Sequence, residues 1–149
     1  MDIHSLARLA GASIWVERKL LETASASLGA LGDADTNLTG RWCAIHGDHI
    51  RRWGERMPVV PGIDTDSLVR SPGGEVDAAA AVLRSAPPGS AEAAIARTTL
   101  LNLLDERYCA ARSSVDASVD GPTARLLDAL ITETAVLLGE LGASEFGRS

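Results

Sequence analysis

Four long stretches of the chain repeat apolar residues at helical spacing, and the breaks between them differ greatly in length. Short links join antiparallel neighbours, whereas a long link lets the chain cross a bundle before its second hairpin. The order of short, long and short links therefore predicts one all-α domain over 1–149. We expect an antiparallel four-helix bundle with a long crossover between helices 2 and 3, built from helices over 5–31, 37–57, 90 to about 115–118, and 120–141.

Start and stop signals set these boundaries. Gly32 ends the first helix, Asn37 can cap the second, and Pro58 prevents the second from continuing. Asp120-Gly121-Pro122 is a strong start signal for the fourth helix, with Asp120 as its cap, and Gly142 is expected to stop it. The crossover segment, 58–89, is rich in proline and glycine, and within it 75–86 is expected to form a few helical turns.

Composition agrees with a small helical domain and excludes some functions. Of the 149 residues, 46% are hydrophobic, which is enough to close one core, and the frequent Ala and Leu favour helices. The net charge of −6 argues against a nucleic-acid partner, which calls for a basic face. No apolar run approaches the ~20 residues of a membrane span, so no membrane partner is expected. Cys43 and Cys109 lack CxxC spacing, which fits a cytoplasmic protein.

Three ionisable side chains fall on the apolar faces of the first two helices. Glu17 lies in the middle of the first apolar stripe, where an unpartnered carboxylate would be costly to bury. His46 and His49 are three residues apart on the apolar face of the second helix, so both rings can reach one point in the core. We expect these three residues to be ligands or proton-transfer groups.

Other polar or aromatic residues share the inward faces. On the second helix Trp42 and Trp53 flank the histidines. On the third helix Arg107 is the polar residue at the middle of the apolar stripe, and Arg97 is a second candidate for that role. Tyr108, next to Arg107 in the sequence, is expected to be buried. The fourth helix contributes Thr134 at mid-stripe, with Glu133 at the border. The candidate ligand-binding residues are thus Trp42, Trp53, Arg107, Tyr108 and Thr134.

The chain resembles the ferritin-like superfamily over nearly its whole length. Those bundles hold two metal ions with a Glu from each of two helices and a Glu-x-x-His pair from each of the other two. Glu17 matches the first-helix glutamate, and His49 matches the second-helix histidine, with His46 in place of its glutamate. The second half departs, because Arg107 or Tyr108 and Thr134-x-x-Leu137 stand where ligands are needed. The resemblance therefore implies the scaffold with a degenerate metal site.

Three interpretations of the polar core stay open. Glu17, His46 and His49 form a two-histidine, one-carboxylate set suited to a single Fe or Zn ion. Alternatively, Glu17 pairs with Arg107 or Arg97, the histidines bind Tyr108 or Thr134, and the tryptophans enclose a pocket for a small apolar molecule, with an acid–base role for histidine. In the third, these residues are a buried network without metal or ligand. An enzyme of this kind would be an oxidase or acid/base catalyst acting on a small molecule, and the sequence leaves open whether the chain is one.

A competing hypothesis is a non-catalytic, metal-free interaction protein. Gly40, Gly47 and Gly54 recur at seven-residue spacing on the back of the second helix, which suggests that another backbone packs there. Trp15 lies opposite the first helix's apolar stripe, where it would contact another chain or be covered by the crossover. These residues predict a homodimer or a partner-binding scaffold.

Overall fold

The computed structural model contains helices and turns but no strand over residues 1–146, the part of the chain that the structure describes; side chains are described for 1–143. The all-α prediction is confirmed, as are the helical turns expected within the crossover. In chain order the elements are α1 (Ile3–Ser27), the 3-10 turn η1 (Leu28–Ala30), α2 (Asp33–Arg56), the 3-10 turn η2 (Thr65–Leu68), α3 (Glu75–Ser85), α4 (Ala91–Ser114) and α5 (Gly121–Phe146).

The second pair of long helices begins at side-chain caps. The Ser90 hydroxyl accepts a hydrogen bond from the backbone N–H of Ala93 at 3.1 Å, as expected for the start of α4. The Asp120 carboxylate accepts from the backbone N–H of Thr123 at 3.2 Å and from the guanidinium of Arg56 at 2.7 Å. Asp120 therefore caps α5 as predicted and also joins its start to the end of α2.

The predicted start of α2 is wrong. The helix begins at Asp33, before Asn37, because the Gly32 carbonyl already accepts a hydrogen bond from the backbone N–H of Thr36 at 2.8 Å. Asp33 and Asp35 then lie in the first turn, where negative charge favours the positive end of the helix dipole. Backbone geometry and charge, without a side-chain cap, set this boundary.

Two other predicted ends are also wrong. The α-helical part of α1 ends at Ser27 and continues to Ala30 only as a 3-10 turn, so Leu31 lies outside it. Gly142 does not stop α5, which runs to Phe146. A single glycine costs a helix only about 1 kcal/mol, and the burial of Leu141 beside it favours continuation.

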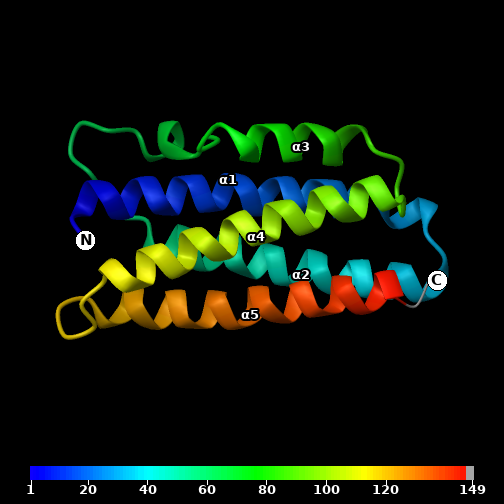
Figure 1. The fold of residues 1–149 in the computed structure, drawn as a ribbon. Helices are drawn as coiled ribbons and strands as arrows, with labels where there is room; N and C mark the ends of the chain where they lie inside the picture. The colour runs from blue at the N-terminus through cyan, green and yellow to red at the C-terminus, as the bar shows by residue number, and fades with distance from the viewer. Residues whose placement is uncertain (147–149) are drawn as a thin grey trace.

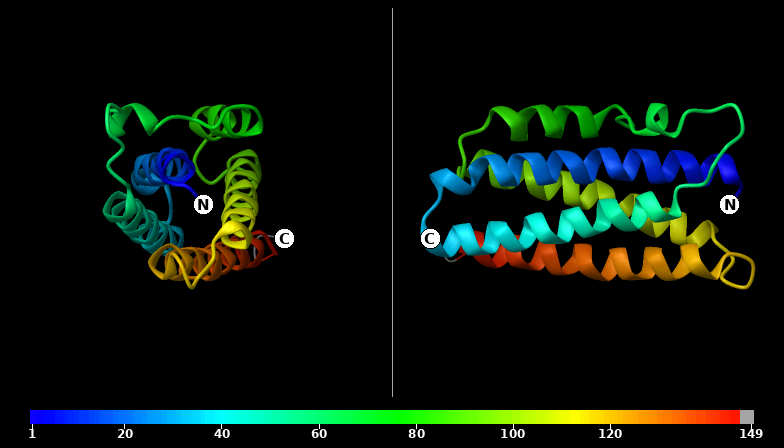
Figure 2. Two further views of the ribbon diagram at one scale, coloured as in Figure 1. Left: turned by 90° about the vertical axis from the view of Figure 1, so that its left-hand side faces the viewer. Right: turned by 180° about the vertical axis from the view of Figure 1, so that it is seen from behind.

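The four long helices lie side by side; α1 and α2 run in opposite directions, as do α4 and α5, whereas α2 and α4 run in the same direction (Figure 1). The closest packing is between α1 and α2 and between α4 and α5. The connection from α2 to α4 carries the chain along the outside, where α3 lies over α1 and α4 (Figure 2). None of the described helices is long and apolar enough to cross a membrane.

Aliphatic side chains from all five α-helices form one core. The wide hydrophobic faces of the long helices supply most of it, and α3 adds Val76, Ala79 and Leu83. Trp53 and Tyr108 are the large aromatic residues that are wholly buried. The core residues less than 2% exposed include Ala10, Leu20, Leu100, Leu101, Leu127, Leu130 and Leu137.

Another segment of the chain approaches α1 closely at Gly11. A Cβ atom added to this residue would lie 2.1 Å from the Leu68 carbonyl oxygen of η2, closer than any real contact. The glycine therefore lets the crossover pack directly on the backbone of α1. The predicted ridge of Gly40, Gly47 and Gly54 has no such neighbour, because a Cβ on each would meet nothing within 4 Å.

Trp15 is not an isolated surface aromatic. It is partly buried, packs against the core, and carries the ammonium of Lys19 over its ring at 5.3 Å from the centroid. Its other neighbours across a cavity include Ala80 and Ala81 of α3. The expectation that Trp15 contacts another chain or is covered by the crossover stays a prediction.

Candidate metal centre

Glu17 lies at the middle of α1, wholly buried, and both of its carboxylate oxygens are bonded to histidines of α2. Oε2 is 2.6 Å from Nδ1 of His46, and Oε1 is 2.8 Å from Nδ1 of His49. Both histidines are also wholly buried. The i, i+3 spacing places the two rings on one face of α2, and the packing of α1 against α2 brings the carboxylate between them.

Hydrogen bonding keeps this buried carboxylate ionised. Burial alone would raise the pKa of Glu17, but the hydrogen bonds from His46 and His49 outweigh it and lower the pKa to about 2. An ionised carboxylate only accepts, so both Nδ1 atoms carry their hydrogens towards Glu17 in the metal-free protein.

His49 also reaches α5. Its Nε2 lies 2.7 Å from Oε2 of Glu133, and the other Glu133 oxygen accepts from both terminal nitrogens of Arg52 at 3.1 Å. The carboxylate on each nitrogen favours the imidazolium form of His49. Burial works to lower its pKa, but the hydrogen bonds and charges of Glu17 and Glu133 raise it. Two carboxylates are thus balanced by His49 and Arg52.

Tyr108 of α4 completes the enclosure of Glu17. Its hydroxyl donates to Glu17 Oε1 at 3.1 Å and accepts from the indole N–H of Trp53 at 3.2 Å. Burial and the nearby Glu17 charge raise the pKa of Tyr108 well above its usual value, so the phenol stays protonated. Trp53 therefore fixes the Tyr108 hydroxyl, which donates to the carboxylate.

Four buried side-chain polar atoms have no hydrogen-bond partner among the described residues. They are Ser13 Oγ, Nε2 of His46, one terminal nitrogen of Arg97 and the Thr134 hydroxyl oxygen. A buried donor or acceptor without a partner costs about 1–3 kcal/mol, so each is available to an added group. The free nitrogen of His46 belongs to a ring whose other nitrogen is held by Glu17.

The structure brings together most, not all, of the predicted site residues. Glu17, His46, His49, Trp53 and Tyr108 form one cluster around the carboxylate. Trp42 lies apart, because its indole N–H donates to Glu140 at 2.9 Å. Thr134 is buried without a partner.

The predicted ion pair between Glu17 and an arginine of the third helix is wrong. Arg107 is half-buried and lines shallow surface hollows near the start of α1. Arg97 is buried but is bonded to Thr23. The expectation that the histidines bind Tyr108 or Thr134 is likewise wrong, because their partners are Glu17 and Glu133.

Two members of the cluster were not assigned a role from the sequence. Glu133 stands at the border of its stripe and reaches inward because His49 offers it a charged partner. Arg52 lies outside the apolar face of α2 and reaches Glu133 along its long side chain. The only sequence signal for Glu133 was its position beside mid-stripe Thr134.

Glu17, His46 and His49 could hold a metal ion. One possible ligand atom from each lies within 4.8 Å of the others, and all three residues are buried. Two imidazoles and a carboxylate suit Fe(II) or Zn²⁺, and the set leaves coordination positions open. In the structure these three side chains are hydrogen-bonded to one another, and a bound ion would take the place of those hydrogen bonds.

Comparison of the chain with models of protein families finds no match. No match is found among curated proteins or among solved structures either. The function therefore has to be argued from the site itself.

Proposed function

We propose that the four long helices form an antiparallel four-helix bundle of the ferritin-like kind, and that its polar core binds a single Fe or Zn ion. The ligands are Glu17, His46 and His49. The observation that carries the proposal is the meeting of one carboxylate and two imidazoles, all buried, with donor atoms within 4.8 Å of one another.

The bond between His49 and Glu133 supports this assignment. A histidine that binds a metal through one nitrogen usually donates its other N–H to a carboxylate or carbonyl, which fixes the ring. His49 faces Glu17 with Nδ1 and Glu133 with Nε2, at 2.7 Å from the second carboxylate. Glu133 therefore fixes this ring through Nε2, and an ion could bind Nδ1 once that nitrogen releases its proton.

The donor set favours one ion over two. A ferritin-like two-metal centre draws four glutamates and two histidines from its helices. Here α4 contributes Tyr108 to the cluster, and α5 contributes Glu133, which is held by Arg52. Only Glu17 and Glu133 supply carboxylates among the described residues of the cluster.

A bound ion would supply Lewis acidity, or a bound water of lowered pKa, to a small molecule. The chain's own residues hold and shield the site. Trp53 and Tyr108 fix the carboxylate of Glu17 and fill the space beside it. Glu133, with a side chain 35% exposed, links His49 to the protein surface and gives a proton a route between cluster and solvent.

Metal binding to tag-free, chelator-treated protein tests the proposal. We expect about one equivalent of Zn²⁺, or of Fe(II) under anaerobic conditions, by calorimetric titration and elemental analysis. The single variants Glu17→Gln and His49→Ala remove one ligand each and should retain less than about a tenth of an equivalent.

His4→Ala is the matched control, because His4 is the remaining histidine of the chain and is exposed. It should bind metal as the wild type does. Circular dichroism must show that each variant is folded. Failure of the wild-type protein to bind, or equal loss in His4→Ala, would exclude the site.

A metal-free acid–base centre is the second candidate. The observation that favours it is the pairing of His46 Nδ1 with Glu17 at 2.6 Å, while Nε2 of the same ring is buried and free. A carboxylate that orients a histidine in this way makes its far nitrogen a proton acceptor for a bound molecule. The ¹⁵N shifts of His46 test this, since a lone pair on Nε2 is required.

The homodimer through Gly40, Gly47, Gly54 and Trp15 stays a prediction. The open space beside the three glycines would admit a second backbone. Light scattering coupled to size-exclusion chromatography decides it, because a strict monomer at high concentration contradicts the homodimer.

A further inference from the structure

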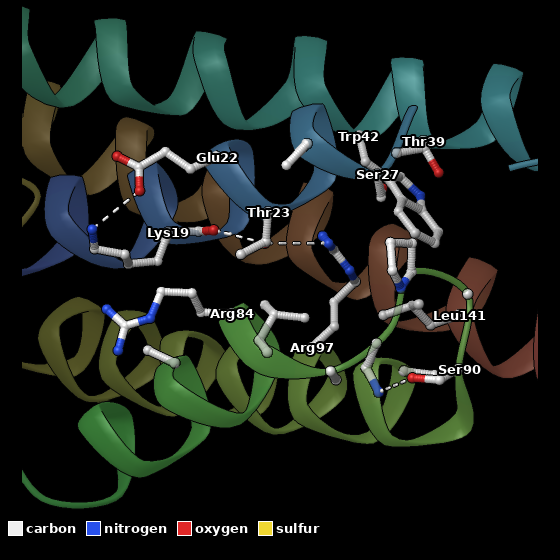
Figure 3. A pocket seen from close by; sticks show the side chains of 18 of the residues that line it. Lys19, Glu22, Thr23, Ser27, Thr39, Trp42, Arg84, Ser90, Arg97 and Leu141 are labelled. Atoms are coloured by element: carbon white, nitrogen blue, oxygen red, sulfur yellow. Dashed lines mark hydrogen bonds and ion pairs between the residues drawn. The ribbon is translucent and has the colours of Figure 1, made fainter. Parts of the chain in front are cut away.

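The structure contains a cavity that is separate from the Glu17 cluster. It has a volume of about 670 Å³, within the range of ~300–1,000 Å³ common for small-molecule pockets. It is lined by α1, α2, α3, the first half of α4 and the link before it, with Leu141 of α5 (Figure 3). Its lining contains none of Glu17, His46, His49, Tyr108 or Glu133.

Arg97 of α4 is the unusual residue of this cavity. Its side chain points towards Thr23 of α1 across the space (Figure 3), and the residue is only 7% exposed. One terminal nitrogen donates to the Thr23 hydroxyl at a long 3.5 Å, and the other has no partner. The guanidinium carbon lies 5.2 Å from the centre of the Trp42 ring.

A buried guanidinium without a counter-ion is costly. Burial lowers the pKa of Arg97 to about 10, which still leaves it charged at neutral pH. Within the described side chains no carboxylate forms an ion pair with it, whereas Arg41, Arg51, Arg52, Arg56 and Arg112 each have one. Among the described residues, therefore, nothing neutralises this charge, and the site suits an added anion.

The other residues that line the cavity indicate which kind of molecule could carry the anionic group. Apolar surface dominates near Arg97, contributed by Trp15, Leu38, Trp42, Leu83 and Leu141. These side chains suit a hydrocarbon or ring but offer nothing to a second charge.

Charged residues at the outer part of the lining are of both signs. Lys19 is paired with Glu22 at 3.1 Å, and Asp77 and Arg84 are exposed. Asp35 also borders the cavity. A molecule with several negative groups would meet these carboxylates, so a single anionic group is favoured.

We propose that this cavity binds a small monocarboxylic acid with an aliphatic or aromatic body. The carboxylate bonds to both terminal nitrogens of Arg97, in the bidentate geometry that guanidinium favours. The body packs between Trp15 and Trp42. This binding does not require the metal centre.

Calorimetric titration of the full chain with octanoate and with 1-octanol tests the proposal, because the two probes share a chain and differ in charge. We expect octanoate to bind at least about tenfold more tightly than octanol, equivalent to ~1.4 kcal/mol. Arg97→Met should weaken octanoate binding about tenfold to a hundredfold and leave octanol binding unchanged.

Arg84→Met is the matched control, since Arg84 borders the same cavity but is exposed. Its octanoate affinity should stay within about twofold of the wild type. Arg97→Lys keeps the charge without the planar fork and should weaken octanoate binding by a smaller factor, which keeps the test valid if Arg97→Met does not fold. No octanoate binding by the wild type at about 1 mM, equal binding of the two probes, or equal effects of the two Met variants would overturn the proposal.

Discussion

Nε2 of His49 lies 2.7 Å from Oε2 of Glu133, while Nδ1 of the same ring lies 2.8 Å from the wholly buried Glu17. One imidazolium thus joins a carboxylate in the core to a carboxylate that is partly open to solvent. The charge of Glu17 is therefore coupled to a residue whose surroundings can change with solution conditions.

Glu133→Gln should lower the pKa of His49 in the metal-free protein. The variant removes one of the two carboxylates that raise this pKa, so it should move back towards the ordinary value of 6.5. An NMR titration of the His49 ring measures it. Asp128→Asn is the control, because Asp128 is also on α5 but pairs with Arg112; a shift of equal size there would contradict the assignment.

Stability of the metal-free protein should pass through a maximum in mildly acidic solution. The folded pKa of Glu17 is lowered from 4.5 to about 2, so its contribution is present above about pH 4.5 and is lost as pH falls towards 2. The folded pKa of His49 is raised above 6.5, so its contribution is present below 6.5 and is lost as pH rises through the folded value. Urea midpoints measured in chelator across pH 3–9 test this. The alkaline decline should be absent in His49→Gln.

Gly11→Ala should destabilise the fold, whereas Gly47→Ala should stabilise it. The added methyl at position 11 would lie 2.1 Å from the Leu68 carbonyl oxygen and must displace η2, at a cost of about 1–3 kcal/mol. Gly47 is also inside a helix but has open space around it, so alanine should add about 0.5–1 kcal/mol. Chemical denaturation measures both. Stabilisation by Gly11→Ala would refute the close contact with η2.

Tyr108→Phe should cost about 1–3 kcal/mol of stability. It leaves the buried indole N–H of Trp53 without an acceptor and removes one donor from Glu17. A double-mutant cycle with Trp53→Phe isolates the hydrogen bond between Trp53 and Tyr108. The double variant should lose less stability than the two single variants together, by at least about 0.5 kcal/mol. Strict additivity would show that the two side chains do not interact.

Helix positions and most of the cluster could be predicted from the sequence because both depend on local spacing. Glu17, His46 and His49 lie at mid-stripe positions, and adjacent helices with a short link bring such positions together. Tyr108 could be placed inward in the same way. The buried residues of α4 include Leu104 and Tyr108 but not Arg107. Neighbouring positions on a helix differ in direction by ~100°, so an error of one position at Arg107 is enough to exchange an inward side chain for an outward one.

What the sequence could not give were partners drawn from distant parts of the chain. Glu133 of α5 reaches inward to bond with His49 of α2. The crossover and α4 lie between these two helices in the sequence, so local spacing does not predict the contact. The pairing of Arg97 with Glu17 was one alternative, and in the structure Arg97 instead lines a separate cavity and contacts Thr23. The need for glycine at position 11 depends on where η2 packs, which no periodicity encodes.

The three proposed metal ligands all come from α1 and α2, and Glu17 and His46 are only 29 positions apart. Closing a loop of that length costs little entropy compared with joining the two ends of the chain. We therefore expect the donors to meet early in folding, as soon as the first hairpin forms. Sequence change in α4 and α5 can then remodel the far side of the bundle, and the Arg97 cavity with it, without dispersing the donors.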